Sequence, residues 1–193
     1  PLSMQKGNTL FDLYSTPNGA QGNDVFGLAS EFKIFSLSAG IELPDFAPVD
    51  IWVSGDYAKN LGYDAEEIAA RVGSADLTNP LTEDQDTAYM IRAEIGSPWM
   101  LDEGEWRLYA AYKHVEADAV LDAFNDSDFL LGGTNAKGFI FGGKYVLQRD
   151  VTLAFRYIDA ESIINPNNPQ SFFGGSLAPL KSSAYQIEIN GKF

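Results

Sequence analysis

Charged side chains of both signs are separated by an even number of positions within several stretches of the chain, and this spacing limits the chemistry open to them. Arg92 and Glu94 form one such pair. Residues two positions apart in an extended strand project from the same face, so these charges would line one side of a sheet. A water-filled wall with both signs orients small hydrophilic solutes and ions and lets them pass. The residues expected on this wall are Asp50, Asp56, Arg92, Glu94, Arg107, Lys113, Lys144, Arg156 and Glu188.

Catalytic motifs are weak by comparison. His114 is the single histidine, and Glu116 follows two residues later. The sequence has no Gly-x-Ser-x-Gly elbow that would supply a nucleophile beside them. Cysteine is absent, which excludes thiolate nucleophiles, thiolate metal sites and disulfides. We therefore expect no enzymatic activity and interpret His114 as a hydrogen-bonding residue near the rim.

Motifs for metals and cofactors are incomplete. Residues 125–128 (NDSD) resemble half of a calcium loop, but the glycine and the distal glutamate at EF-hand spacing are missing. Two glycine pairs, 132–133 and 142–143, are not followed by the Gly-Lys-Ser/Thr of a phosphate loop. We expect no metal and no cofactor. We interpret the acids of residues 125–128 as part of a solvated loop. The glycine pairs are expected where strands bend or pack closely.

Composition excludes several classes of protein. The chain has 193 residues, enough for one domain, and carries 27 acidic against 13 basic side chains. This excess of acid argues against nucleic acid as a partner, because phosphates need surplus cations. No apolar run reaches the roughly 18 residues of a membrane-spanning helix. The start, PLSMQKGN, does not resemble a signal peptide, so we expect a mature chain or a fragment beginning inside a longer one.

The carboxyl-terminal stretch, residues 183–193, has the clearest strand pattern. Its apolar members are Tyr185, Ile187, Ile189 and Phe193, and polar residues lie between them. This alternation predicts a strand with one apolar face. Its length matches the roughly 9 to 11 residues with which a tilted strand crosses a bilayer.

Similar alternation along the chain predicts about eight strands. They cover residues 9–15, 35–43, 49–57, 89–96, 106–113, 139–147, 151–158 and 183–193. Short connections at 44–48, 96–104 and 148–150 alternate with long polar ones at 17–24, 60–86, 116–135 and 162–182. Outer-membrane barrels have short periplasmic turns and long extracellular loops, and the alternation fits that arrangement.

Two of the long connections contain helical signals. Asp64, followed by Glu67 and an apolar run, predicts a capped short helix. Val120, Leu121 and Phe124 have helical spacing. They fit either a loop helix over the barrel mouth or an extension of the flanking strand.

Aromatic residues are expected near the strand ends. They are Trp52, Trp99, Trp106, Tyr89, Tyr185 and Phe193. In a bilayer they would form an aromatic girdle at the interfaces. In a soluble barrel they would be core residues, and the chain would then be a lipocalin-like cup for an apolar ligand.

Residues 134–161 (TNAKGFIFGGKYVLQRDVTLAFRYIDAE), together with the aromatic terminal strand, resemble the end of the putative porins of Gram-negative bacteria. The resemblance covers roughly the last 60 residues and becomes a general strand pattern upstream. It implies that the terminal strand, with Tyr185, Ile187, Ile189 and Phe193, is the signal read by the barrel assembly machinery. Members of that family are typically longer, so the chain resembles a carboxyl-terminal portion.

The expected fold is therefore all-β, an antiparallel up-and-down transmembrane β-barrel of about eight strands, either closed by itself or part of a larger barrel. Residues 1–193 would form a single domain or the carboxyl-terminal portion of one. The expected function is an outer-membrane porin-like channel for passive diffusion of small hydrophilic solutes or ions. Alternatives are a small closed outer-membrane barrel with a structural or adhesion role, and the lipocalin-like binder. Expected partners are outer-membrane lipid, lipopolysaccharide, the assembly machinery and the solutes, with a homo-oligomer as an open alternative to a single copy.

Overall fold

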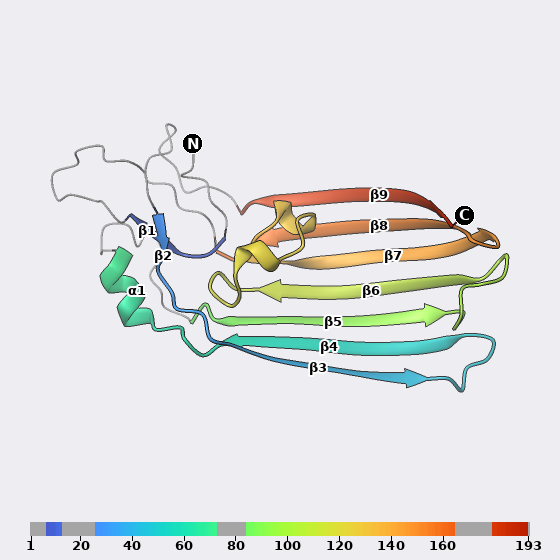
Figure 1. Ribbon diagram of the computed structural model, residues 1–193, viewed down its shortest axis with the longest axis horizontal. Helices are drawn as coiled ribbons and strands as arrows, with labels where there is room; N and C mark the ends of the chain where they lie inside the picture. Colours follow the sequence, from blue (N-terminus) through green and yellow to red (C-terminus); the bar gives the residue numbers. More distant parts are fainter. Residues whose placement is uncertain (1–6, 13–25, 73–83, 165–178, 193) are drawn as a thin grey trace.

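Seven strands form one antiparallel sheet in a computed structural model that describes residues 7–12, 26–72, 84–164 and 179–192. The strands follow one another across the sheet in chain order (Figure 1). They are β3 (Ile34–Leu43), β4 (Asp50–Asn60), β5 (Thr87–Gly96), β6 (Trp106–Val115), β7 (Ala136–Gln148), β8 (Val151–Ser162) and β9 (Lys181–Gly191). The all-β antiparallel class is confirmed. Among the described residues the sheet is open, because β3 and β9 are edge strands that do not pair with each other.

The expected first strand, over residues 9–15, is not part of this sheet. β1 (Leu10–Asp12) pairs with β2 (Phe26–Leu28) in a separate two-stranded sheet. Residues 13–15 lie outside the described part of the chain. Periodicity identifies a strand but not its partner, and three residues of β2 are too few to show a period.

Short and long connections alternate as predicted. Residues 44–49, 97–105 and 149–150 join strands at one end of the sheet, which we call the turn end. Residues 61–86, 116–135 and 163–180 join strands at the other, the loop end. The last strand, β9, runs toward the turn end (Figure 1).

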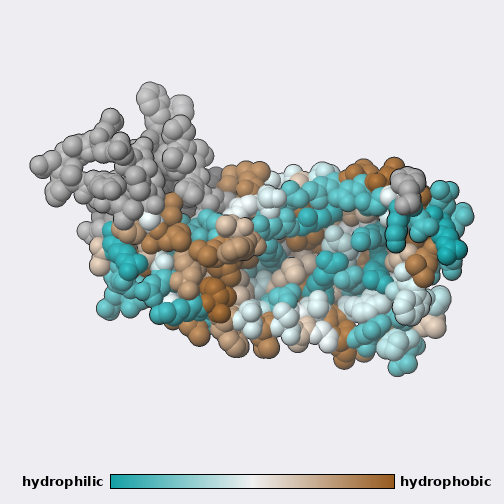
Figure 2. Space-filling view, viewed as in Figure 1, coloured by the Kyte–Doolittle hydropathy of each residue, from teal (hydrophilic) through white to brown (hydrophobic). Residues whose placement is uncertain are grey.

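Through the middle and the turn end of the seven strands, the register keeps apolar and charged side chains on opposite faces, whereas at the loop end the apolar side also carries charged residues: Lys59, Lys137, Asp159, Glu161 and Lys181. Ile51 is opposite Ile95, and Ile95 is opposite Leu108, all on what we call the apolar face. On β9, Ile187 and Ile189 extend this face with exposed fractions of 78% and 70%. Figure 2 shows the other side, the charged face, where hydrophilic residues lie over the middle of the sheet.

The loop end carries the helical segments. α1 (Ala65–Val72) begins as predicted, because Asp64 Oδ1 accepts hydrogen bonds from the backbone of Glu66 and Glu67 at 2.9 and 3.0 Å. The β6–β7 loop (residues 116–135) contains two short 3-10 turns, η2 (Asp122–Phe124) and η3 (Phe129–Leu131), rather than one helix or an extended strand. Phe124, in η2, is 83% exposed. No helix in the described ranges is long and apolar enough to cross a membrane.

Asn60, at the loop end of β4, joins three separate segments. Its side chain is 1% exposed and donates to the carbonyls of Glu31 and Asp118 at 2.7 and 2.9 Å. Its Oδ1 accepts from the backbone of Lys33 and Gly62 at 2.9 and 3.0 Å. One buried amide thus connects the segment before β3, the end of β4 and the β6–β7 loop.

Replacing Asn60 with Ala should loosen the loop end, because buried backbone groups left unpaired cost about 1–3 kcal/mol each. We expect faster hydrogen exchange at the Lys33 and Gly62 amides, measured by mass spectrometry or NMR. Asn125→Ala is the control, since its amide donates one bond, to Leu121 O at 3.3 Å within its own loop. Equal protection of both amides in Asn60→Ala would contradict this role.

Candidate functional site

The charged face brings together the nine residues expected on a polar wall. The register places Asp50, Asp56, Arg92, Glu94, Arg107, Lys113, Lys144, Arg156 and Glu188 on this one face. One row across the sheet consists of Trp52, Glu94, Tyr109, Gly142, Arg156 and Gln186. Neighbouring rows lie two residues apart along the strands, so the charges form a lattice rather than a single cluster.

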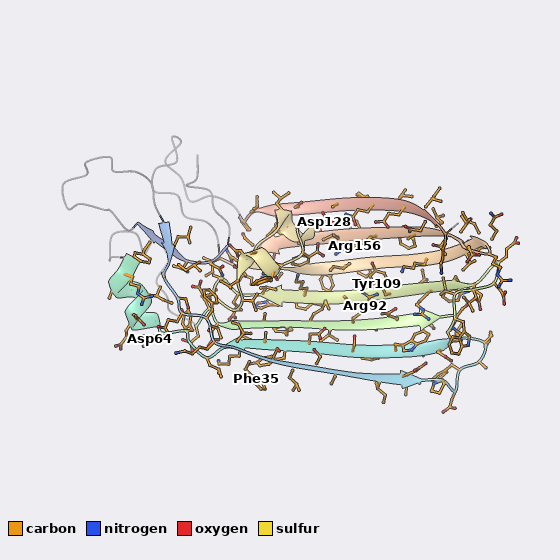
Figure 3. The ribbon with its side chains drawn as sticks, viewed as in Figure 1. Phe35, Asp64, Arg92, Tyr109, Asp128 and Arg156 are labelled. Carbon is orange, nitrogen blue, oxygen red and sulfur yellow. The ribbon has the colours of Figure 1, made fainter. Side chains whose placement is uncertain are left out.

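Arg92 is fixed by two neighbours. Its Nε donates to Glu94 Oε1 at 2.7 Å, and its guanidinium lies 3.9 Å from the centroid of the Tyr109 ring (Figure 3). Gly142 makes room for this ring, because a Cβ there would lie 2.5 Å from the Tyr109 ring. Gly142 on β7 therefore lets the Tyr109 ring take the position over which Arg92 of β5 lies.

Arg107 is held at the turn end. Its Nη2 donates to the carbonyls of Ser97 and Pro98, each at 2.8 Å. The guanidinium lies 4.2 Å from the centre of the Trp52 ring. Trp52 thus belongs to the charged face, and its expected place in an aromatic girdle is wrong. The alternation in β4 puts it opposite Glu94, and an arginine covers its ring in place of lipid.

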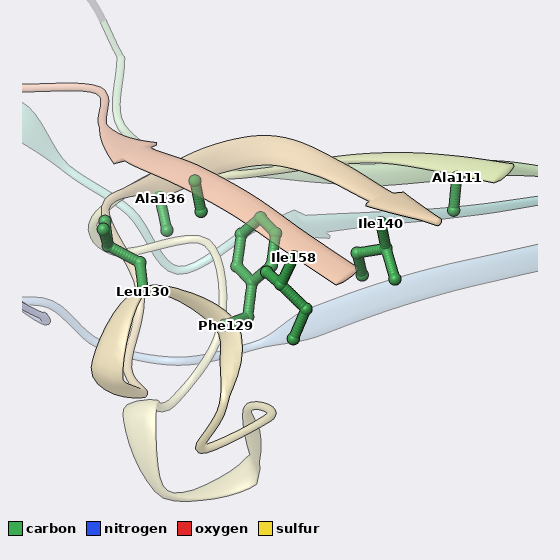
Figure 4. Close-up of a cluster of buried hydrophobic side chains, with 7 residues drawn as sticks. Ala111, Phe129, Leu130, Ala136, Ile140 and Ile158 are labelled. Carbon is green, nitrogen blue, oxygen red and sulfur yellow. The ribbon is translucent and has the colours of Figure 1, made fainter. Parts of the chain in front are cut away.

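The β6–β7 loop folds back onto the charged face. Phe129 is 1% exposed and packs in a cluster with Ala111, Ile140 and Ile158, which lie on that face of the sheet (Figure 4). Lys113 Nζ lies 4.9 Å from the centre of the Phe129 ring. Apolar contact therefore anchors the loop above three central strands.

Two carboxylates of the same loop meet a cation of the sheet. Arg156 forms an ion pair with Asp126 and lies near Asp128, with Nη1 3.8 Å from Asp128 Oδ2 (Figure 3). Gln186 Nε2 donates to the same Asp128 oxygen at 2.7 Å. Arg156 and Gln186 face each other across β8 and β9, so adjacent strands present one arginine and one amide to the loop.

The surroundings of Asp126 act on its pKa in opposite directions. Burial raises the pKa, while the hydrogen bonds from Arg156 and from the Asp128 backbone, with the charges of Arg156 and Lys113, lower it. The lowering effects prevail, and the pKa of Asp126 lies below its ordinary value. The docked loop therefore favours the ionised carboxylate.

The remaining charges have different partners. Asp56 accepts a hydrogen bond from Ser38 Oγ at 2.6 Å. Asp50, Lys144 and Glu188 form no ion pair with any residue that the structure describes. Lys144 lies opposite Arg107, a pairing of like charges that is unfavourable in the absence of an anion.

The apolar face carries a row of ring contacts near the loop end. Successive centroids are 4.7 to 6.5 Å apart, and the row runs from β5 to β9 through Tyr89, Tyr112, Phe139, Phe141, Tyr157 and Tyr185. Trp106 lies on the same face at the turn end, and Trp99, in the turn, is 77% exposed. Phe193 lies outside the described residues.

His114 also lies on the apolar face. Its ring stacks on Tyr89 at 5.0 Å, and Nε2 lies 3.5 Å from Glu116 Oε1. Within the described ranges no cluster of three or more His, Asp or Glu side chains is placed to hold a metal ion.

The family described as "Putative porin" matches residues 1–193. The chain belongs to this family. The resemblance in the last strands is thus confirmed, and the match extends upstream over the whole sequence. No curated protein and no solved structure matches the chain.

The sequence did not identify the loop contacts of the site. The sequence pattern favours a solvated role for Asp126 and Asp128, whereas the structure brings both to Arg156. The available signal is the apolar run Phe129–Leu131 inside a polar loop, of which the first two residues are buried.

Acid should release the tip of the β6–β7 loop. The lowered pKa of Asp126 means that its ionised form stabilises docking above the ordinary pKa of about 3.9, and this stabilisation is lost as pH falls through the lowered value. A fluorophore on Ser127→Cys should report release below about pH 4. Asp126→Asn should reduce this pH step, and an unchanged step in that variant would contradict the assignment.

Proposed function

We propose that the chain forms part of the wall of an outer-membrane channel for passive diffusion of small hydrophilic solutes or ions. The observation that carries this proposal is the separation of charged and apolar side chains onto opposite faces through the middle and the turn end of the sheet. The apolar face would meet lipid and the charged face would line water. Strands of 10 to 13 residues are long enough for the roughly 9 to 11 that a crossing needs.

The proposed barrel needs strands beyond the seven in the main sheet. Seven antiparallel strands in chain order leave β3 and β9 pointing in the same direction. Direct pairing of these edges would be parallel, whereas bacterial single-chain barrels are antiparallel with an even number of strands. Copies inserted in the same orientation would meet at the same parallel junction. We therefore propose that an odd number of further strands lies between β9 and β3.

A lipocalin-like cup would require the apolar face to be the inner one. Exposed fractions of 79%, 78% and 70% at Tyr185, Ile187 and Ile189 instead leave these side chains uncovered, as a lipid-facing position requires. The β6–β7 loop folds over the opposite, charged face. Both observations favour the channel over the soluble binder.

The proposed setting follows from the family. Lipid and lipopolysaccharide would surround the apolar face, and the aromatic row would lie at the bilayer interface. Tyr185, Ile187, Ile189 and Phe193 would form the signal for the assembly machinery. We propose a structural role for His114, whose ring stacks on Tyr89. We also propose that the chain is not an enzyme.

Planar-bilayer recording of the full-length protein tests the channel. Arg107→Gln should shift the reversal potential toward cation preference, because the carboxylates Asp50 and Glu188 then dominate its row. The shift should shrink at 1 M salt, where the screening length is about 3 Å. Arg149→Gln, in an exposed turn, is the matched control. A complete absence of channels would refute the proposal.

Ile187→Lys should destabilise the protein in lipid by about 2–4 kcal/mol, because the cation would face the middle of the bilayer. Glu188→Lys, one residue further along β9 and on the charged face, should have a much smaller effect. Unfolding in lipid vesicles, followed by tryptophan fluorescence in urea, measures both. Equal losses for the two variants would contradict the assignment of faces.

A further inference from the structure

The charges on the charged face are segregated by strand. On β6, β7 and β8 the charged residues of this face are cations only: Arg107, Lys113, Lys144 and Arg156. On β3 and β4 they are acids only: Glu42, Asp50 and Asp56. A small anion passing along this face would therefore be drawn to the central strands.

The β6–β7 loop places two of its own carboxylates on these central cations. Asp126 and Asp128 both meet Arg156, and Gln186 donates to Asp128. Lys113 lies on the same face, with its Nζ 4.9 Å from the centre of the Phe129 ring of this loop. Arginine holds carboxylates in a planar, two-pronged geometry, and an amide N–H adds a directed donor. The contacts thus display a site that accepts two carboxylates close together.

The site is open to solvent on one side. The side chains of Arg156 and Asp126 are 26% and 31% exposed, and that of Asp128 is 46% exposed. The loop is also held independently by Phe129, so the carboxylates can leave Arg156 without complete undocking of the loop.

We propose that Arg156, Lys113 and Gln186 form a binding site for small dicarboxylate solutes, and that Asp126 and Asp128 occupy it when no solute is bound. This inference rests on the proposed channel and names the class of solute that the channel takes up. The solute and the tip of the loop compete for the same donors, so binding shifts the tip from docked to released. The apparent affinity equals the intrinsic affinity multiplied by the fraction of molecules in which the tip of the loop is released, so a docked tip weakens binding.

Succinate is the probe, with acetate and sulfate compared at equal ionic strength on the full-length protein. A fluorophore on Ser127→Cys reports loop release in detergent, and planar-bilayer currents report block. Succinate should release the loop and block the current over the same concentration range. Acetate and sulfate should need at least about tenfold more, because neither offers two carboxylates.

Three variants separate competition from a purely structural role. Asp126→Asn with Asp128→Asn should lower the half-blocking concentration of succinate by about tenfold or more, since the internal competitor is gone. Arg156→Gln should abolish block, and Arg156→Lys should weaken it if the glutamine variant fails to fold. Arg149→Gln is the control and should leave block unchanged.

The outcomes distinguish the two proposals. Channels that conduct but respond equally to succinate and sulfate, or to neither, overturn the dicarboxylate site and leave the channel intact. Loop release by succinate without any conductance overturns the channel and supports the site. A half-blocking concentration that the double Asn variant does not change overturns the competition between loop and solute.

Discussion

The structure depends on an unbroken register from β3 to β9. Side chains alternate between two faces with a period of two, so a slip of one residue in any strand would turn its charges toward the apolar face. The pairing shows one irregularity, between Val146 and Gln148, at the turn end beyond Lys144. Every row of the charged face therefore stays aligned, and residues from distant parts of the chain meet at defined positions.

The β6–β7 loop makes two kinds of contact with the charged face, one apolar and one ionic. Phe129 packs against apolar residues in the centre of an otherwise polar face, and Asp126 and Asp128 meet cations beside it. Burial of the ring is independent of charge, whereas the ion pair depends on pH and on competing anions. The packing of Phe129 fixes the position of the loop. The ion pair with Arg156 makes docking of the loop tip depend on pH and on competing anions.

Local pattern was sufficient for the strands, the turns and the faces. The alternation in residues 183–193 predicted the face of each β9 residue, and the Asp64 to Glu67 spacing predicted the start of α1. These features depend on neighbours in the sequence, which a single chain displays directly.

Features that depend on partners far away in the sequence escaped prediction. Tryptophan is a residue type typical of aromatic girdles, and only the position of Arg107 shows that Trp52 lies under a cation. β1 has a strand pattern, but its partner β2 lies outside the main sheet. The loop contacts at Arg156 join residues about thirty positions apart through a turn geometry that no period encodes.

The parallel direction of the edge strands β3 and β9 bears on how such barrels change size in evolution. Three hairpins, β3–β4, β5–β6 and β7–β8, each leave the loop end and return to it. Duplication or loss of one hairpin changes the circumference by two strands and preserves the sense of every remaining strand. Loss of a single strand would invert everything that follows it, including the carboxyl terminus. The hairpin is therefore the unit by which genetic change can widen or narrow the structure.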